Sequence, residues 1–200
     1  MRLPLVLASA SPRRRELLVQ LEIAFEVVPS NVPEQPLATE SACEFAARVA
    51  RDKAVHVARE RPQQWVLAAD TVVVVDGEIL GKPRDRTDAR RMLRQLSGRT
   101  HHVLTAVTLL APEAARADEV VVETTVRFRS LHDREIEAYI DTGEPFDKAG
   151  AYAVQGHAAA FVDAIDGSYS NVVGLPLDEV RELCRRLGLP ARATHVDRST

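Results

Sequence analysis

Two charged side chains stand where an ordinary folded domain would place apolar ones. Asp70 interrupts the run Val66–Val75, which otherwise has the pattern of a buried β-strand. Because an isolated buried carboxylate is costly, Asp70 should be ion-paired, bind a metal, or lie where the strand opens into a cleft. Lys53 falls within the apolar stripe of a predicted helix, four residues from both Val49 and Val57. Its stem either covers apolar surface while its head reaches water, or its charge points inward toward an anionic ligand.

A cluster of cations follows the first predicted strand. The segment Ser9-Ala10-Ser11-Pro12-Arg13-Arg14-Arg15 lies at a strand-to-helix junction. Free N–H groups and the helix dipole attract anions at such a junction, and arginine offers two parallel donors to a phosphate. Cations alone at a helix N-terminus oppose the dipole. The segment is therefore either a capped helix with exposed arginines or an anion site, and it lacks the spacing of a P-loop.

Two later segments add groups that suit a phosphorylated ligand. Gly81-Lys82-Pro83 follows a predicted hairpin and brings another lysine close in sequence to Asp70. The segment Asp147–Gly156 is rich in small residues, and the amide of Gln155 offers both a donor and an acceptor to a base edge. A plain glycine-rich turn explains this second segment more simply.

The sequence has no signature of a covalent nucleophile. No Gly-x-Ser-x-Gly elbow is present. His101 and His102 are adjacent on a predicted strand and point to opposite faces, which is a poor geometry for a metal. Cations and carboxylates without a nucleophile favour metal-assisted hydrolysis of a polyphosphate by an activated water.

The overall composition is that of a folded domain of moderate size. The 200 residues are 46% hydrophobic and 28% charged, and 26 Lys and Arg against 29 Asp and Glu give a net charge of −3. This balance excludes a polybasic nucleic-acid binder, and the apolar fraction excludes a disordered chain. Cys43 and Cys184 form no CxxC pair, and no apolar run approaches the ~20 residues of a membrane span. We expect a cytoplasmic protein with no nucleic-acid or membrane partner.

The hydrophobic periodicity alternates between strands and helices. Strands are predicted over Leu3–Ala8, Phe25–Val28, Trp65–Val75, Glu78–Leu80, Val103–Leu110, Glu119–Arg129 and Ala158–Ile165. Helices are predicted over Pro12–Leu21, Glu40–Arg61, Thr87–Leu96, 132–141 and 176–187. This pattern predicts an α/β fold with a mixed sheet in one domain, residues 1–188, with two lobes around a cleft. Residues 189–200 lack periodicity and are expected to fray.

Six blocks, in order along the chain, resemble the Maf family of nucleoside triphosphate pyrophosphatases from about Leu5 to Leu187. They are Leu7-Ala8-Ser9-Ala10-Ser11-Pro12-Arg13-Arg14, Ala69-Asp70-Thr71-Val72-Val73, Gly81-Lys82-Pro83, Leu96-Ser97-Gly98-Arg99-Thr100-His101, Gly143-Glu144-Pro145 and Gly174-Leu175-Pro176. The resemblance implies an elongated mixed β-sheet flanked by helices, with two lobes around a nucleotide-binding cleft, as in inosine triphosphate pyrophosphatases. It also implies a homodimer and, with Mg²⁺ or Mn²⁺, cleavage between the α and β phosphates to a monophosphate and pyrophosphate.

The resemblance also assigns roles to single residues. Asp70 corresponds to the group that accepts a proton from the attacking water, and it shares the metal with Glu34. Many members have a second acidic residue just before Glu34, where this chain has Pro33. The phosphate-binding positions are Ser9, Arg13, Arg14, Lys53 and Lys82.

Base choice within the family is associated with Arg13, Thr71 and Gln155, and this chain matches the dTTP/UTP subfamily at all three. A glutamine suits a pyrimidine, whose O4 and N3–H need one donor and one acceptor. The 7-methyl-GTP subfamily has an aromatic residue in the first motif and acidic residues at the other two positions. A pyrophosphatase for 7-methyl-GTP or another modified nucleotide is the alternative enzyme. A nucleotide-binding regulator of cell division or septum formation, which would release no pyrophosphate, is the alternative of another class.

Overall fold

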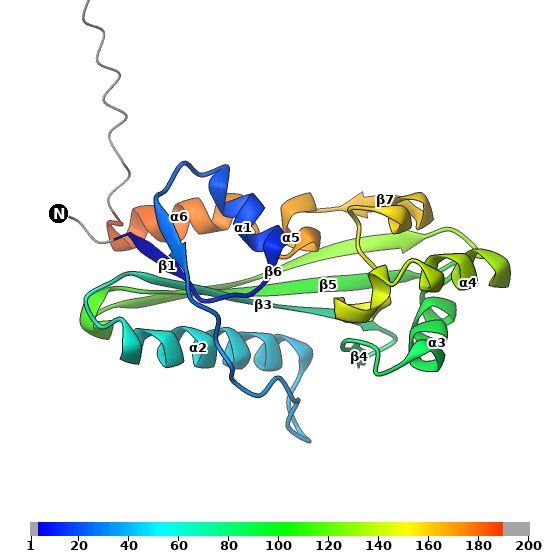
Figure 1. Ribbon diagram of the computed structural model, residues 1–200, viewed down its shortest axis with the longest axis horizontal. Coiled ribbons are helices and arrows are strands. Elements are labelled where there is room, and N and C mark those ends of the chain that lie inside the picture. The colour runs from blue at the N-terminus through cyan, green and yellow to red at the C-terminus, as the bar shows by residue number, and fades with distance from the viewer. Residues whose placement is uncertain (1–3, 190–200) are drawn as a thin grey trace, which may run out of the picture.

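The computed structural model describes residues 4–189, and a seven-stranded mixed sheet runs through its length (Figure 1). The strand order is β2-β1-β3-β5-β6-β7, with β4 beside β3. β1 is parallel to β2 and β3, and the remaining pairs are antiparallel. The strands are β1 (Leu5–Leu7), β2 (Phe25–Val27), β3 (Val66–Val75), β4 (Glu78–Leu80), β5 (Thr100–Leu110), β6 (Ala117–Phe128) and β7 (Val162–Asp166).

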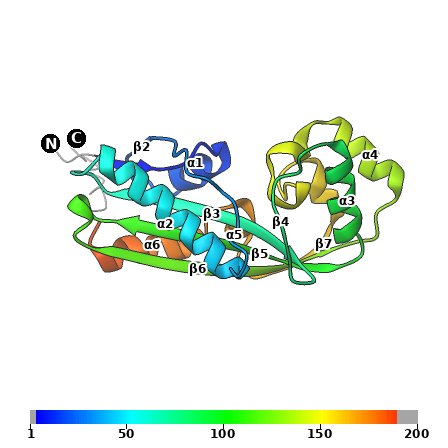
Figure 2. The same ribbon diagram turned by 90° about the horizontal axis from the view of Figure 1, so that it is seen from below.

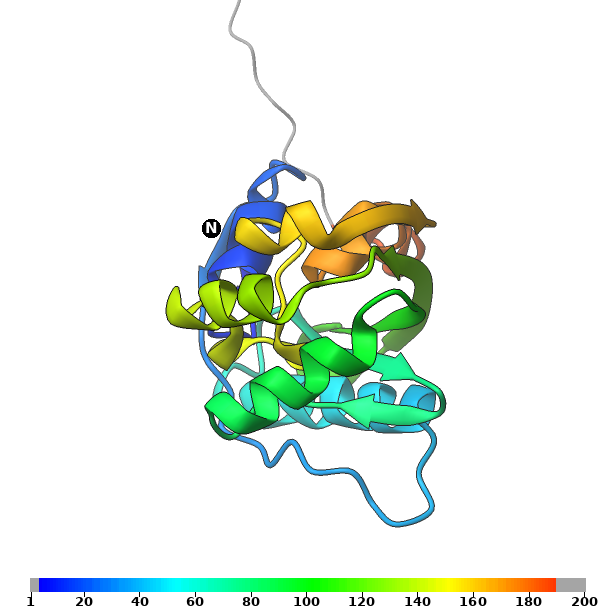
Figure 3. The ribbon, with the colours of Figure 1, turned by 90° about the vertical axis from the view of Figure 1, so that its right-hand side faces the viewer.

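The helices cover both faces of the sheet and one of its ends. They are α1 (Pro12–Val19), α2 (Ala42–Glu60), α3 (Arg86–Leu96), α4 (Asp133–Asp141), α5 (Tyr169–Val173) and α6 (Leu177–Leu187). α2 lies on one face, and α1 and α6 lie on the other (Figure 1). α3 and α4 pack together at the far end of the long strands, so the molecule has the two expected lobes (Figure 2). Figure 3 views that second lobe end-on.

Local sequence features fix the ends of these elements. Ser41 and Glu44 form a reciprocal capping box, so α2 begins at Ala42 rather than at Glu40. Asp76 and Gly77 have φ angles of 50° and 80°, the left-handed backbone that a two-residue hairpin needs. In residues 4–189, no helix is long and apolar enough to cross a bilayer.

One predicted strand is wrong over its first half. Residues His157–Phe161 form a 3₁₀ helix, and β7 begins only at Val162. The run Ala158-Ala159-Ala160 has no β-branched side chain to favour a strand, and the Arg129 guanidinium donates to the Ala160 carbonyl at 2.8 Å.

Other elements differ at their ends or had no prediction. The single-turn 3₁₀ helices Pro112–Ala114, Glu144–Asp147 and Ala149–Ala151, and helix α5, were not predicted as helices, because each is too short for periodicity to reveal. Leu3, the predicted start of the first strand, lies outside the described residues. So does the predicted frayed tail beyond Leu189.

Candidate active site

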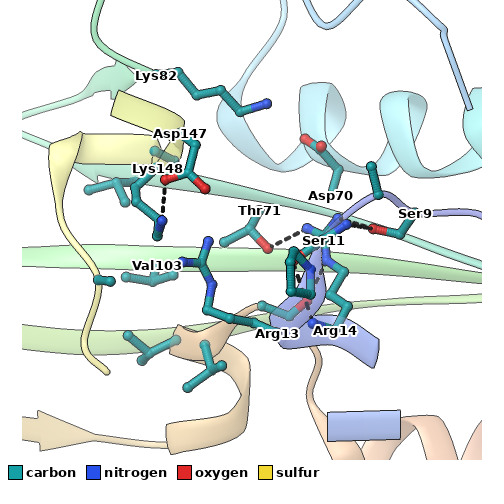
Figure 4. A pocket seen from close by; sticks show the side chains of 18 of the residues that line it. Ser9, Ser11, Arg13, Arg14, Asp70, Thr71, Lys82, Val103, Asp147 and Lys148 are labelled. Carbon is teal, nitrogen blue, oxygen red and sulfur yellow. Dashed lines mark hydrogen bonds and ion pairs between the residues drawn. The ribbon is translucent and has the colours of Figure 1, made fainter. Parts of the chain in front are cut away.

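A cleft of about 330 Å³ opens beside the middle of the sheet. The turn after β1, the N-terminus of α1, one side of α2 and the centre of β3 form one wall, and the segment 147–155 forms the other. Figure 4 shows Ser9, Arg14 and Asp70 on one side of it and Asp147 and Lys148 on the other, with the Arg13 side chain reaching from α1 toward Lys148. The volume is in the range of sites that bind small ligands.

Lys53 joins two carboxylates inside this cleft. Its Nζ lies 2.8 Å from Asp70 Oδ1 and 2.6 Å from Glu34 Oε1. The side chains of Lys53 and Asp70 are only 7% and 9% exposed, whereas Glu34 is 39% exposed. Lys82 Nζ reaches Glu34 Oε2 from the outer side at 3.5 Å. Lys53 therefore points into the cleft rather than to solvent, and Asp70 is both ion-paired and cleft-facing.

The two carboxylates have opposite tendencies to hold a proton. Burial raises the pKa of the Asp70 carboxyl, and the charges of Lys53 and Arg14 offset part of that rise. For Glu34, partial burial acts in the same direction, but hydrogen bonds and charges from Lys53 and Lys82 outweigh it and lower its pKa. A raised pKa suits a general base, because it brings proton affinity closer to neutral pH. Asp70 thus has the electrostatics of a base and Glu34 those of a permanent anion.

The carboxylate oxygens of the cleft suit a hard divalent cation only if a bound phosphate ligand supplies further oxygen atoms. Within residues 4–189, no three His, Cys, Asp or Glu side chains converge on a common metal position. Mg²⁺ is commonly held by one or two carboxylates together with substrate phosphates. Glu34 and Asp70 supply such a pair of oxygen donors, so these residues fit a magnesium or manganese ion that arrives with a polyphosphate.

Arg14 is held rigidly at the inner wall. Its Nε donates to the Gly174 carbonyl at 2.8 Å, its Nη2 to Thr71 Oγ1 at 2.9 Å, and its Nη1 to Ser9 Oγ at 3.4 Å. Gly174 ends α5 with φ 119°, and a Cβ there would lie 3.4 Å from Thr71 Oγ1. The Gly174-Leu175-Pro176 block therefore positions the Arg14 guanidinium, whose remaining N–H groups are available to an anion.

The opposite wall carries a second charged group that the sequence did not single out. Lys148 lines the cleft with its side chain 11% exposed, and it pairs with Asp147 and donates to the Glu144 carbonyl at 3.4 Å. Arg13 lines the same part of the cleft. Ser30 is another lining residue without a prediction, and its Oγ is buried with no hydrogen-bond partner. In the sequence, Ser30 follows Pro29 and Lys148 lies two residues before Gly150, and neither pattern distinguishes these residues from those of an ordinary loop.

Gln155 lies on a segment that is anchored on both sides. The Ala153 N–H donates to Tyr139 Oη at 3.2 Å, and Tyr139 Oη donates to Glu144 Oε1 at 3.0 Å. The His157 N–H donates to Glu144 Oε2 at 3.2 Å, and His157 Nδ1 lies 2.9 Å from the same oxygen. The Gly143-Glu144-Pro145 block therefore fixes the segment that presents Gln155.

The structure brings all the predicted site residues to one cleft. Those that line it are Ser9, Arg13, Arg14, Glu34, Lys53, Asp70, Thr71, Lys82 and Gln155. Among the described histidines, none lines the cleft. His101 is fully buried against Tyr152, and burial lowers its pKa to about 4, so it is neutral and structural.

Comparison with known proteins finds similar sequences over nearly the whole chain. The family model described as Maf-like protein matches residues 4–187. A protein of Anaeromyxobacter dehalogenans named dTTP/UTP pyrophosphatase is 56% identical over 188 residues, which cover 93% of this chain and 95% of the relative. One of the same name from Geobacter sulfurreducens is 53% identical over 92% of this chain and 96% of its own length. The solved structure of the Staphylococcus aureus Ham1 protein overlaps 62% of this chain and 71% of its own, at 14% identity and a TM-score of 0.43.

Proposed function

The chain belongs to the Maf family, and on that premise we propose that it is a nucleoside triphosphate pyrophosphatase that hydrolyses dTTP and UTP. The observation that carries the proposal is the buried Lys53–Asp70 pair, open to a cleft lined by further cations. Water attacks the α-phosphorus, a new P–O bond forms, and the bond from the α-phosphorus to the bridging oxygen breaks. The products are the nucleoside monophosphate and pyrophosphate.

Asp70 accepts the proton of the attacking water. Lys53 occupies Oδ1 of this carboxylate, which leaves Oδ2 for the water. The same hydrogen bond fixes the orientation of the carboxylate, and burial supplies the raised pKa that a base requires. Proton transfer to Oδ2 thus needs no movement of the Lys53 ammonium.

The cations of the cleft bind the triphosphate and stabilise the charge that develops on the leaving pyrophosphate. Arg14 is held in place before the substrate arrives, so little reorganisation is needed when that charge appears. Lys82 is 60% exposed and extends from the rim, as expected of a group that meets the outer phosphates. A Mg²⁺ or Mn²⁺ held by Glu34 and Asp70 would add Lewis-acid polarisation of the phosphate oxygens.

Base choice is assigned to Arg13, Thr71 and Gln155. Gln155 lies exposed between two anchored neighbours, where its amide is free to meet a ligand. The amide N–H groups can donate to O4 of uracil and thymine, and an acceptor beside them in the cleft completes the match by accepting from N3–H. An acidic side chain at this position would instead suit the cationic ring of 7-methyl-guanine.

The proposal includes a homodimer, which the family resemblance supports and sedimentation would test. It also places the protein in the cytoplasm. Cys43 and Cys184 are both free thiols, which agrees with a reducing compartment.

A nucleotide panel tests the function directly. Pyrophosphate release from dTTP, UTP, CTP and 7-methyl-GTP is measured with Mg²⁺ and with Mn²⁺. We expect the largest kcat/KM for dTTP and UTP. A preference for 7-methyl-GTP would instead favour the modified-nucleotide enzyme. Tight nucleotide binding without pyrophosphate release would favour the nucleotide-binding regulator of cell division.

A further inference from the structure

A relay of hydrogen bonds runs from the cleft into the interior of the sheet. Arg14 Nη2 donates to Thr71 Oγ1 at 2.9 Å, and Thr71 Oγ1 lies 3.0 Å from Thr105 Oγ1 on the neighbouring strand. Thr105 Oγ1 in turn donates to the Asn171 carbonyl at 3.0 Å. Thr71 is half-buried and lines the cleft, whereas Thr105 is fully buried beneath it.

The number of protons limits how this relay can be arranged. A hydroxyl has one proton to donate and two lone pairs, and a guanidinium only donates. Thr71 must therefore accept from Arg14. If Thr105 donates to Asn171, then the contact between the two threonines requires Thr71 to donate to Thr105. The proton of Thr71 is then directed into the protein, and only a lone pair remains for the cleft.

The opposite arrangement makes one hydrogen bond fewer. In it Thr105 would donate to Thr71 instead of the Asn171 carbonyl, and the proton of Thr71 would have no partner within the relay. The contact to Asn171 would also be lost inside a buried region, where a low dielectric strengthens hydrogen bonds. The inward arrangement is therefore the more stable one before a substrate binds.

We propose that Thr105 is a positioning residue for base selection, because it holds Thr71 as a pure hydrogen-bond acceptor toward the substrate. As an acceptor, Thr71 Oγ1 can form a hydrogen bond with the N3–H of uracil or thymine. N3 of cytosine carries a lone pair instead of a proton, so it forms no hydrogen bond with this oxygen. This inference rests on the proposed function, and it names the atom by which UTP is distinguished from CTP.

The test compares two threonines of β5. Thr105→Val removes the buried hydroxyl and keeps the shape, so the Thr71 proton loses its acceptor and becomes free to turn toward the base. The ratio of kcat/KM for UTP to that for CTP is expected to fall about 3- to 10-fold, the factor that one hydrogen bond contributes. Thr105→Ser keeps the hydroxyl and is expected to keep the ratio.

Thr108→Val is the matched control. Thr108 lies three residues along β5, is equally buried at 1% exposure, and donates to Glu119 at 3.3 Å, outside the cleft lining. Its UTP-to-CTP ratio is expected to equal that of the wild type. If Thr105→Val does not fold, as judged by circular dichroism, Thr105→Ala removes the same hydroxyl with a smaller side chain and carries the same expectation.

An unchanged UTP-to-CTP ratio in a folded variant without the Thr105 hydroxyl overturns the inference. If kcat/KM also falls, by the same factor for both nucleotides, Thr105 only supports packing or Arg14. Failure of the wild-type protein to release pyrophosphate from UTP would be a different result, because it would overturn the proposed function itself.

Discussion

The two sides of the cleft are built from different kinds of structure. The reaction end, consisting of Glu34, Lys53 and Asp70, has its two buried members in the middle of the 19-residue helix α2 and the 10-residue strand β3. The base end, the segment 144–157, consists of two single-turn 3₁₀ helices and the turns after them. Its conformation depends on contacts to the Tyr139 and Glu144 side chains rather than on a sheet ladder.

This difference separates chemistry from recognition. A group on a long buried element is held by many backbone hydrogen bonds, so its geometry survives changes elsewhere. A turn held by a few side chains is repositioned by one substitution, which changes which ligand fits. Substitutions at the reaction end should therefore slow turnover of every nucleotide, whereas substitutions at the base end should alter the ratio between nucleotides.

The largest effect is expected for Asp70→Asn. An amide cannot accept the proton of the attacking water, so kcat for dTTP should fall about 10²- to 10⁴-fold, the usual contribution of a general base. Pyrophosphate release and circular dichroism are measured together. Asp76→Asn is the matched control, since Asp76 directly follows β3, is 63% exposed and pairs with Arg99. Near wild-type turnover by a folded Asp70→Asn protein would remove Asp70 from this role.

Lys53→Met should both destabilise and inactivate the protein, whereas Lys82→Met should only weaken activity. Loss of the Lys53 ammonium leaves Asp70 buried without its partner. This should lower the free energy of unfolding by about 3–5 kcal/mol. Lys82 contacts Glu34 at the rim, where an exposed ion pair contributes about 0–1 kcal/mol. Urea titration with assay of each folded variant measures both effects. Equal stability losses would contradict the contrast between the buried and exposed lysines.

The pH dependence should report the burial of Asp70. The base must be ionised, so kcat/KM should decline as the pH falls through the pKa of Asp70, with a midpoint above the ordinary value of about 3.9. A raised folded-state pKa also means that the contribution of Asp70 to stability is greatest below its unfolded pKa and is lost as pH rises through its folded pKa. Asp70→Asn should therefore gain stability relative to the wild type between those two pKa values. An acidic limb at or below 3.9 would contradict this account.

The elements that the sequence predicted well are those with long periodic patterns. The helix that carries Lys53 and the strand that carries Asp70 were predicted within two residues at each end, because their apolar residues recur over many positions. Asp70 itself was conspicuous because a carboxylate inside such a strand conflicts with burial. Asp70 and Lys53 could therefore be singled out from residue types alone, whereas Glu34 was indicated only by the family resemblance.

The base end could not be derived in that way. Glu144 and Tyr139 act through their contacts to a turn. In the sequence, a polar residue that anchors a turn cannot be distinguished from an ordinary polar residue near glycines in a loop. The relay through Thr105 was equally hidden, since threonine is common in strands and only the pairing of β3 with β5 places it behind Thr71. A residue that acts through a neighbour on another strand can be identified only when the register of the sheet is known, and hydrophobic periodicity does not provide that register.

The smallest effect, and the one most specific to the base end, is expected for Glu144→Ala. This change removes the acceptor for the His157 N–H, which is one anchor of the segment that presents Gln155. It also removes the acceptor that orients Tyr139 Oη, the group to which the other anchor, the Ala153 N–H, donates. The ratio of kcat/KM for UTP to that for GTP should fall about 3- to 10-fold, as expected for one or two hydrogen bonds, while kcat for UTP changes less. Glu123→Ala is the control. Its carboxylate lies 2.7 Å from His102 Nδ1, much as Glu144 lies 2.9 Å from His157 Nδ1, but it belongs to β6 and makes no contact with the segment that presents Gln155.

A uniform loss of kcat in Glu144→Ala, with the UTP-to-GTP ratio unchanged, would show that the segment 144–157 serves the reaction rather than the base. The separation between the two ends of the cleft would then be wrong. A changed ratio in Glu123→Ala would contradict it in another way, because base choice would then respond to the sheet as a whole. A change in the ratio for Glu144→Ala alone would show that the turn contributes to recognition beside Thr71, and it would leave the chemistry with Asp70 on β3 and Lys53 on α2.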